Sequence, residues 1–311
     1  MSGLIKPEKL SAAPQFSPLN YAQFFAAGGI CATVTHGALT PVDVVKTRLQ
    51  LEPSGSKMSM REMAKTIVMK DGPSGLLTGF GSTAVGYLIQ GGAKYCGYEF
   101  FKKQAIDYFG VQKAKEHRQL VYMGSATAAE LIASTLLTPL EASRIRLVSQ
   151  PSYARGLVDA MQRMWAQEGM GGFYAGYIPI LLKQVPFSIG QFYTNEMMHN
   201  FVNAYVPKDK LQRAGKTGQI TVQLGCGIVA GSVAAILSHP ADTLLSKINR
   251  GGVGHGSMMS KLGVAAQQTG FVGLWAGLGT RIIMTAALVS SQFLIYDQLK
   301  LFFGTPHSIE V

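Results

Sequence analysis

Acidic and basic side chains recur at fixed spacing in a short segment that the chain repeats three times. Each copy begins with a proline, has an acid two residues later, and has a cation three residues, five residues, or both after the acid. The copies begin at Pro41, Pro139 and Pro240, about one hundred residues apart, which indicates an internal repeat. Opposite charges at such positions could form ion pairs between neighbouring segments. The charged residues concerned are Asp43, Lys46, Arg48, Glu141, Arg144, Arg146, Asp242 and Lys247.

Two further titratable residues share a helix face with acids of this segment. His36 precedes Asp43 by seven residues and Glu130 precedes Glu141 by eleven, and both spacings fall within about 20° of whole helical turns. Histidine changes charge near neutral pH, and a carboxylate within an apolar segment is a candidate for function. We therefore expect His36, Glu130 and Glu141 to bind and release protons. The alternative for His36 is a structural role.

The segments that carry these residues are apolar but interrupted by charges. The chain is 47% hydrophobic and only 14% charged, whereas soluble proteins carry about 25% charged residues. It nevertheless has no clean run of about 20 uncharged apolar residues. These properties fit a membrane protein whose helices enclose a polar interior. The net charge of +11 is dispersed without a block of like charges, which argues against a nucleic-acid partner.

Residue patterns for enzymatic or metal chemistry are missing from the sequence. Cys31, Cys96 and Cys226 lie far apart and show no CxxC spacing, so we expect neither a disulfide framework nor a metal site. The chain also has no P-loop and no GxSxG nucleophile motif. We therefore predict that the protein is not an enzyme and holds no cofactor.

Each repeat unit consists of a long helix, a short amphipathic helix and a second long helix. The proline lies in the first long segment, whose roughly 30 residues would span about 45 Å, more than the hydrocarbon core of a bilayer requires. Glu99, Glu196 and Asp297 recur in the second long segment in the same register as the prolines. We predict an all-α membrane protein with six spans in three tandem pairs. The predicted units are 19–110, 115–206 and 215–304, after an N-terminal tail at 1–18.

The threefold segment of proline, acid and cation is followed each time by a short helix ending in glycine. A further glycine comes next, at 79, 176 and 277, and in the second and third copies it completes an aromatic-x-Gly motif. This pattern resembles the mitochondrial carrier family over nearly the whole chain. The resemblance implies a pseudo-threefold barrel of six transmembrane helices in the mitochondrial inner membrane, with alternating access. It places both termini on the intermembrane-space side and the short amphipathic helices on the matrix side. Inner-membrane lipid, in particular cardiolipin at matrix-side helix termini, is an implied partner.

Within the family, the stretches 36–53, 139–151 and 240–247 resemble the phosphate carriers. This resemblance implies import of inorganic phosphate by proton symport, or by the equivalent phosphate/hydroxide antiport. The alternative is a mitochondrial carrier for another solute, such as copper or a small carboxylate. A nucleotide is disfavoured, because the third copy ends Ser246-Lys-Ile-Asn249, without the arginine triplet of ADP/ATP carriers.

The resemblance also implies two gates made of ion pairs. On the matrix side, the family's arrangement pairs Asp43 with Arg144 and pairs Asp242 with Lys46; a static brace is the alternative. The matrix gate is expected to comprise Pro41, Asp43, Lys46, Pro139, Glu141, Arg144, Pro240, Asp242 and Lys247. The cytoplasmic gate is expected to comprise Glu99, Lys102, Glu196, His199, Asp297 and Lys300. His199 replaces a cation of the family pattern and Asn195 an aromatic residue, which weakens the expected closure of the cytoplasmic gate.

Glu141 departs from the threefold pattern. The repeat would place its partner cation at position 245, where the chain has Leu245, and Lys247 follows two residues later. A carboxylate without a partner in a low-dielectric site tends to take up a proton. The sequence therefore predicts that Glu141 is unpaired and contributes to proton coupling.

The expected substrate site lies at mid-depth on the second long helix of each unit, at a level that resembles the family's substrate contact points. Lysine and glutamine around a glycine suit a compact oxyanion, for which lysine acts as a point charge. The alternative for Lys183 is a lysine that extends toward the membrane surface. The predicted substrate-binding residues are Lys183, Gln184, Gln90, Lys94, Gly86, Thr285 and Arg281.

Overall fold

The computed structural model describes residues 15–51, 58–150, 152–206, 215–249 and 258–306. Most of the predicted N-terminal tail lies outside the described residues. All regular structure in the described residues is helical, which confirms the predicted all-α class. The helices are α1 (Pro18–Leu51), α2 (Met60–Asp71), the 3-10 helix η1 (Pro73–Leu77), α3 (Phe80–Phe109), α4 (Val111–Glu116), α5 (Arg118–Ser149), α6 (Leu157–Tyr174), α7 (Tyr177–Tyr205), α9 (Gly215–Asn249), α10 (Met258–Gly273) and α11 (Leu278–Phe303).

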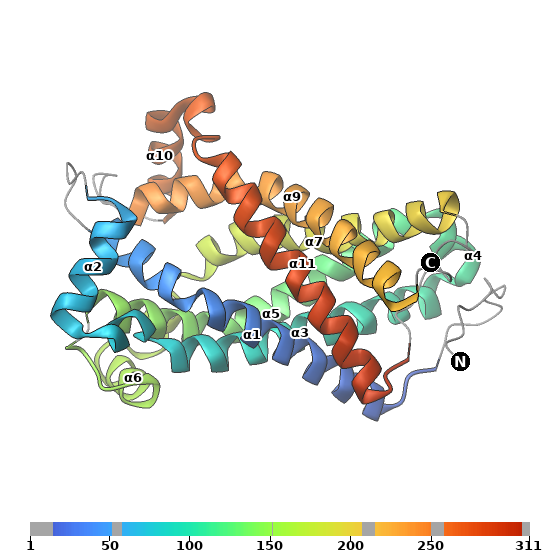
Figure 1. Ribbon diagram of the computed structural model, residues 1–311, viewed down its shortest axis with the longest axis horizontal. Coiled ribbons are helices and arrows are strands. Elements are labelled where there is room, and N and C mark those ends of the chain that lie inside the picture. Colours follow the sequence, from blue (N-terminus) through green and yellow to red (C-terminus); the bar gives the residue numbers. More distant parts are fainter. Residues whose placement is uncertain (1–14, 52–57, 151, 207–214, 250–257, 307–311) are drawn as a thin grey trace.

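The six long helices form a closed ring. Each of α1, α3, α5, α7 and α9 packs against the next long helix in chain order, and α11 returns to α1. The short helices α2, α6 and α10 lie together at one end, and the beginning of α1 and the end of α11 lie at the other (Figure 1). We call these the short-helix end and the terminal end. By length and composition, α5, the 217–245 part of α9, and α11 are apolar enough to cross a membrane.

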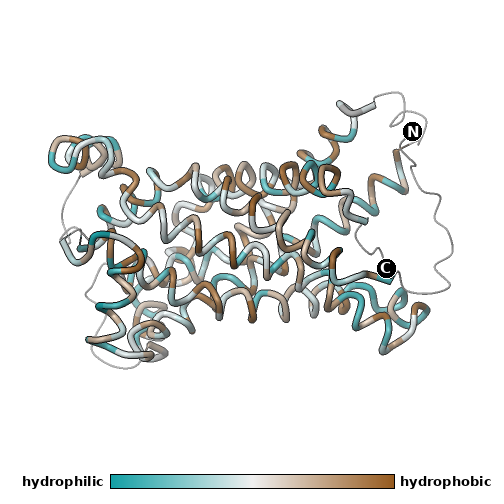
Figure 2. Tube along the Cα trace, turned by 90° about the horizontal axis from the view of Figure 1, so that it is seen from below, coloured by the Kyte–Doolittle hydropathy of each residue, from teal (hydrophilic) through white to brown (hydrophobic). Residues whose placement is uncertain are grey.

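Apolar residues run along the long helices, and hydrophilic residues are more frequent toward the two ends (Figure 2). Small residues allow the long helices to approach closely. A Cβ atom on Gly28 would lie 2.6 Å from the Tyr95 Cβ, and one on Gly91 would lie 2.4 Å from the Ala32 Cβ. The backbones of α1 and α3 therefore touch where the sequence places its small residues.

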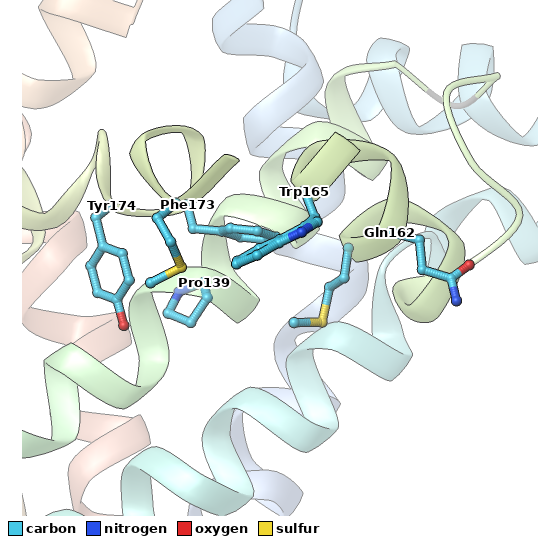
Figure 3. Close-up of a pocket in the computed structure, with 7 residues that line it drawn as sticks. Pro139, Gln162, Trp165, Phe173 and Tyr174 are labelled. Carbon is cyan, nitrogen blue, oxygen red and sulfur yellow. The ribbon is translucent and has the colours of Figure 1, made fainter. Parts of the chain in front are cut away.

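Proline interrupts the hydrogen bonds of α1, α5 and α9 at Pro41, Pro139 and Pro240, while each helix continues beyond it. In α5 the proline lines an apolar groove of about 450 Å³ between α5 and α6 (Figure 3). Met161, Trp165 and Phe173 of α6 supply much of its other wall. Pro139 of the long helix thus faces the apolar side of the short helix.

The cation five residues after the acid in each repeated segment anchors a short helix. Arg48 pairs with Asp71 at 2.6 Å in the first unit, and Arg146 pairs with Glu168 at 2.5 Å in the second. In the third unit, the Lys247 Nζ donates to the Thr269 Oγ1 at 3.1 Å. The next residue is in each case a glycine with positive φ, at 72, 169 and 270, which allows the chain to turn there. These cations hold the short helices against the ring.

Candidate functional site

A cluster of polar side chains surrounds Glu130 inside the ring, between α3, α5 and α7. Glu130 is fully buried, and its carboxylate pairs with the Lys94 Nζ at 3.2 Å. Three neutral donors complete the cluster, namely Gln90 Nε2 at 3.4 Å, Ser134 Oγ at 2.7 Å, and Ser188 Oγ. Such a charge is tolerated in a buried site because it is paired and hydrogen-bonded. Glu130 therefore points into the interior, as its helix spacing predicted.

His36 lies nearby and packs against a tyrosine. Its ring stacks on Tyr87 with ring centroids 3.6 Å apart and planes 4° apart. Three cations act electrostatically on the imidazole, namely Arg144, Lys94 and Lys183. His36 is therefore placed where an approaching anion would be attracted.

The short-helix end carries an ion-pair network centred on Arg144. Its guanidinium reaches Asp43 of α1 at 3.3 Å and both carboxylate oxygens of Glu141 at 2.8 and 3.1 Å. The expected pair between Asp43 and Arg144 is thus present. The prediction that Glu141 is unpaired is wrong, because an arginine one turn along the same helix can reach it. Arg144 is shared between two acids.

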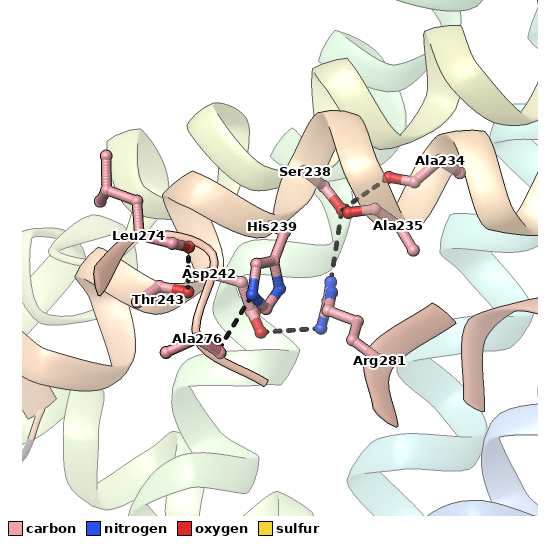
Figure 4. A network of polar contacts seen from close by, with 9 residues as sticks. All are labelled: Ala234, Ala235, Ser238, His239, Asp242, Thr243, Leu274, Ala276 and Arg281. Atoms are coloured by element: carbon pink, nitrogen blue, oxygen red, sulfur yellow. Dashed lines mark hydrogen bonds and ion pairs between the residues drawn. The ribbon is translucent and has the colours of Figure 1, made fainter. Parts of the chain in front are cut away.

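The third repeat forms a separate network (Figure 4). Asp242 of α9 pairs with Arg281 of α11 at 2.7 Å, and the same guanidinium reaches the Ser238 Oγ at 3.4 Å. The expected pair between Asp242 and Lys46 is absent from the described residues, because Arg281 occupies that carboxylate. Arg281, predicted to bind substrate, is engaged by the gate acid. The expected gate residue Lys247 bonds instead to α10, away from Glu141.

His239 belongs to this third network and was missed in the sequence. Its Nε2 lies 3.1 Å from the carbonyl oxygen of Ala276, and the Thr243 Oγ1 donates to the carbonyl oxygen of Leu274 at 3.1 Å. In the other two repeats, a threonine stands before the proline and bonds to its own helix. A histidine at the position of these threonines was the available signal, because its longer side chain reaches the turn before α11.

Lys183 and Lys46 remain as cations without an ion pair in the part of the chain that the structure describes. Both act electrostatically on Asp43 and Asp242, which places them between the two networks of the short-helix end. Lys183 is half-buried, as is Gln184, whereas Thr285 is buried. A Cβ on Gly86 would lie 3.3 Å from the Leu137 Cδ1.

The terminal end is closed by a buried lysine and a layer of aromatic rings. Lys102 is fully buried and pairs with Glu196 at 2.9 Å and Glu99 at 3.0 Å. Asp297 and Lys300 pair within α11 at 3.0 Å. His199 takes part in no ion pair among the described residues. The rings beneath this network belong to Tyr95, Tyr98, Phe192, Phe293 and Tyr296.

The two ends therefore differ. The gate acids Asp43, Glu141 and Asp242 at the short-helix end are 18–31% exposed, whereas Glu99, Glu196 and Asp297 at the terminal end are 4–22% exposed. In the described residues, no group of three His, Cys, Asp or Glu side chains could hold a metal ion. The arrangement is a ring with charged side chains inside and an ion-pair network at each end, and its two ends are not equally open.

Comparison with known proteins shows what kind of molecule this ring is. The family model described as "Mitochondrial carrier protein" matches residues 17–109, 115–206 and 216–307. The Dictyostelium discoideum protein "Mitochondrial substrate carrier family protein N" is 41% identical over 94% of this chain and 98% of its own length. The Schizosaccharomyces pombe "Probable mitochondrial phosphate carrier protein" is 35% identical over 94% of this chain and 93% of its own.

An Arabidopsis thaliana relative, "Mitochondrial phosphate carrier protein 2, mitochondrial", is 33% identical over 94% of this chain and 78% of its own. Three matches to one family model agree with the three repeat units of the ring. The chain belongs to the mitochondrial carrier family and is a multi-pass transporter of the mitochondrial inner membrane, not an enzyme.

Proposed function

We propose that this carrier imports inorganic phosphate into the matrix together with a proton, or in exchange for hydroxide. Relatives that match most of the chain are named as phosphate carriers. The observation that carries the proposal is the buried pair of Lys94 and Glu130, 3.2 Å apart inside the ring. In such a pair, the lysine can bind an anion and the carboxylate can bind a proton.

Coupling follows from charge. When Glu130 takes up a proton, it loses its attraction for Lys94, and the ammonium group becomes available to a phosphate ion. Conversely, phosphate that draws Lys94 away leaves a buried carboxylate, which favours protonation. Each ligand therefore promotes binding of the other, as linkage requires. Lys183 extends the positive region toward the short-helix end, which we assign to the matrix side.

The two ion-pair networks then act as alternating gates. At the matrix side, Arg144 is shared between Asp43 of α1 and Glu141 of its own helix. Opening this side separates Arg144 from Asp43 and leaves it on Glu141. Closing this side draws Arg144 toward Asp43, and Glu141 is then free to take up a proton. We therefore still propose that Glu141 takes part in proton coupling, with its protonation controlled by whether Arg144 is bound to it or to Asp43.

The test compares two activities of the purified carrier in liposomes. Glu130→Gln keeps the shape of the side chain and removes its charge change, so uptake of radiolabelled phosphate driven by a pH gradient should fall to background. Exchange of phosphate for phosphate moves no net proton and should partly survive. Glu168→Gln, which alters a surface acid bonded to Arg146, is the matched control. Wild-type uptake by Glu130→Gln under a pH gradient would refute the proposed proton site.

The same assay examines the remaining alternatives. Copper and small carboxylates are added as competitors of phosphate uptake. Inhibition of uptake by either of them, without inhibition by arsenate, would assign that solute as the substrate in place of phosphate. Cardiolipin at the matrix-side helix termini remains a proposal. Its test is the thermal stability of the carrier in detergent with and without added cardiolipin.

A further inference from the structure

A buried chain of hydrogen bonds joins one helix from each of the three repeats. Gln191 of α7 donates from Nε2 to the Gln292 Oε1 of α11 at 3.2 Å. Gln292 donates from its own Nε2 to the Thr35 Oγ1 of α1, also at 3.2 Å. All three side chains are at least 93% buried. These hydrogen bonds lie on the inner side of the aromatic layer. The helices α7 and α11 run toward the terminal end, and Gln191 and Gln292 directly precede Phe192 and Phe293 of that layer.

The direction of these hydrogen bonds is fixed at the Thr35 end. The Thr35 hydroxyl donates its proton to the carbonyl oxygen of Cys31 at 2.9 Å, so it can only accept from Gln292. Gln292 must therefore turn its NH₂ toward Thr35 and its oxygen toward Gln191. Gln191 must in turn offer its NH₂ to Gln292. The Oε1 of Gln191 is left buried without a hydrogen-bond partner, which is uncommon for a buried polar atom.

This acceptor borders the cluster around Glu130. Gln191 stands one turn beyond Ser188, whose hydroxyl donates to Glu130. The Lys94 ammonium lies over the ring of Phe192, the next residue of α7, 5.4 Å from its centroid. The Tyr95 hydroxyl lies between Gln191 and Cys31 and interacts with both. The free acceptor of Gln191 therefore lies next to the proposed phosphate ligand Lys94.

We propose that Gln191 determines specificity by accepting a hydrogen bond from a P–OH group of the transported anion. This inference rests on the proposed function. Dihydrogen phosphate carries both hydroxyl groups and free oxygens, so it can donate to Gln191 and accept from Lys94. Sulfate at neutral pH carries no proton, and its oxygens would face the unpaired Gln191 oxygen. Two buried acceptors, the Gln191 oxygen and a sulfate oxygen, would then face each other without a proton between them, which disfavours sulfate binding. The site therefore selects oxyanions that carry a proton.

The experiment measures competition by sulfate and arsenate against phosphate–phosphate exchange in liposomes. Gln191→Met removes the acceptor with little change of volume. Ser290→Ala, at a similarly buried position of α11, removes a hydroxyl that bonds only within its own helix and leaves the chain of hydrogen bonds intact. For the wild type and Ser290→Ala, arsenate should compete and sulfate should not. For Gln191→Met, the preference for phosphate over sulfate should fall by about tenfold, as expected for loss of one buried hydrogen bond.

Two results would overturn the proposal. One is an unchanged preference in Gln191→Met; the other is an equal loss in Gln191→Met and Ser290→Ala, which would assign the effect to packing around the site and not to the acceptor. If a variant does not transport, the stabilisation of the purified carrier against heat by phosphate and by sulfate gives the same comparison. Absence of phosphate exchange in the wild type would instead refute the proposed function. Exchange without uptake driven by a pH gradient would refute only the proton coupling.

Discussion

Replacing Asp43 by asparagine tests the matrix gate most directly. Asp43 and Arg144 form the one ion pair that joins two repeats at the short-helix end in the described part of the chain, with 3.3 Å between Oδ2 and Nη2. Asparagine keeps the shape of the side chain and removes its charge. Arg144 retains Glu141 as a partner, so no buried cation is left alone. The substitution should therefore impair the gate more than the fold.

The size of the effect follows from the distance and the exposure. Two unit charges 3.3 Å apart attract by roughly 5 kcal/mol at an effective dielectric constant of about 20. Asp43 is 31% exposed, so hydration and desolvation reduce the net contribution to about 1–2 kcal/mol. The closed form of the matrix gate should then lose a factor of about 5–30 in population.

The assay is phosphate uptake in liposomes beside thermal unfolding in detergent. Asp43→Asn should lose most transport while the unfolding temperature changes by only a few degrees, as a change of about 1 kcal/mol allows. Asp71→Asn is the matched control, because it breaks an ion pair between α1 and α2 within one repeat. Its transport should stay close to wild type. Full transport by Asp43→Asn, or equal losses in the two variants, would refute the gate.

Four further predictions concern single residues. Lys183→Ala should lose phosphate uptake and Lys183→Arg should recover little, because arginine differs in shape and hydration; unchanged uptake by Lys183→Ala would place the substrate site elsewhere. Glu141→Gln should lose uptake driven by a pH gradient and keep part of phosphate exchange, and equal loss of both activities would argue against a proton role. His239→Thr should destabilise the carrier by about 1 kcal/mol through loss of the bond to Ala276, and His239→Gln should restore thermal stability. Hydrogen bonds from the N-cap serine lower the pKa of Glu62, so its stabilisation of α2 is present at neutral pH and is lost as the pH falls through that lowered pKa. Amide hydrogen exchange at the start of α2 should therefore become faster in acid than the intrinsic rate predicts. Exchange that follows only the intrinsic pH dependence would contradict this prediction.

The sequence by itself determined the architecture. Threefold recurrence of proline, acid and cation at nearly equal spacing requires three equivalent units, and the apolar composition requires them to pack as helices in a membrane. Helical periodicity also placed Glu130 in the interior, because eleven residues return nearly to the same face. The pair of Asp43 and Arg144 followed from the family's arrangement of equivalent positions.

Only the tertiary structure decided which charges meet. Arg281 and Lys46 are both near Asp242, yet the carboxylate pairs with Arg281. Lys94 reaches Glu130 across 36 residues of sequence because α3 and α5 lie side by side. Long cationic side chains can adopt many rotamers, so their partners depend on small differences in position between helices rather than on spacing along one helix. The hydrogen-bond chain that leaves the Gln191 oxygen free has the same origin, because its direction is set by a hydroxyl on a helix of another repeat.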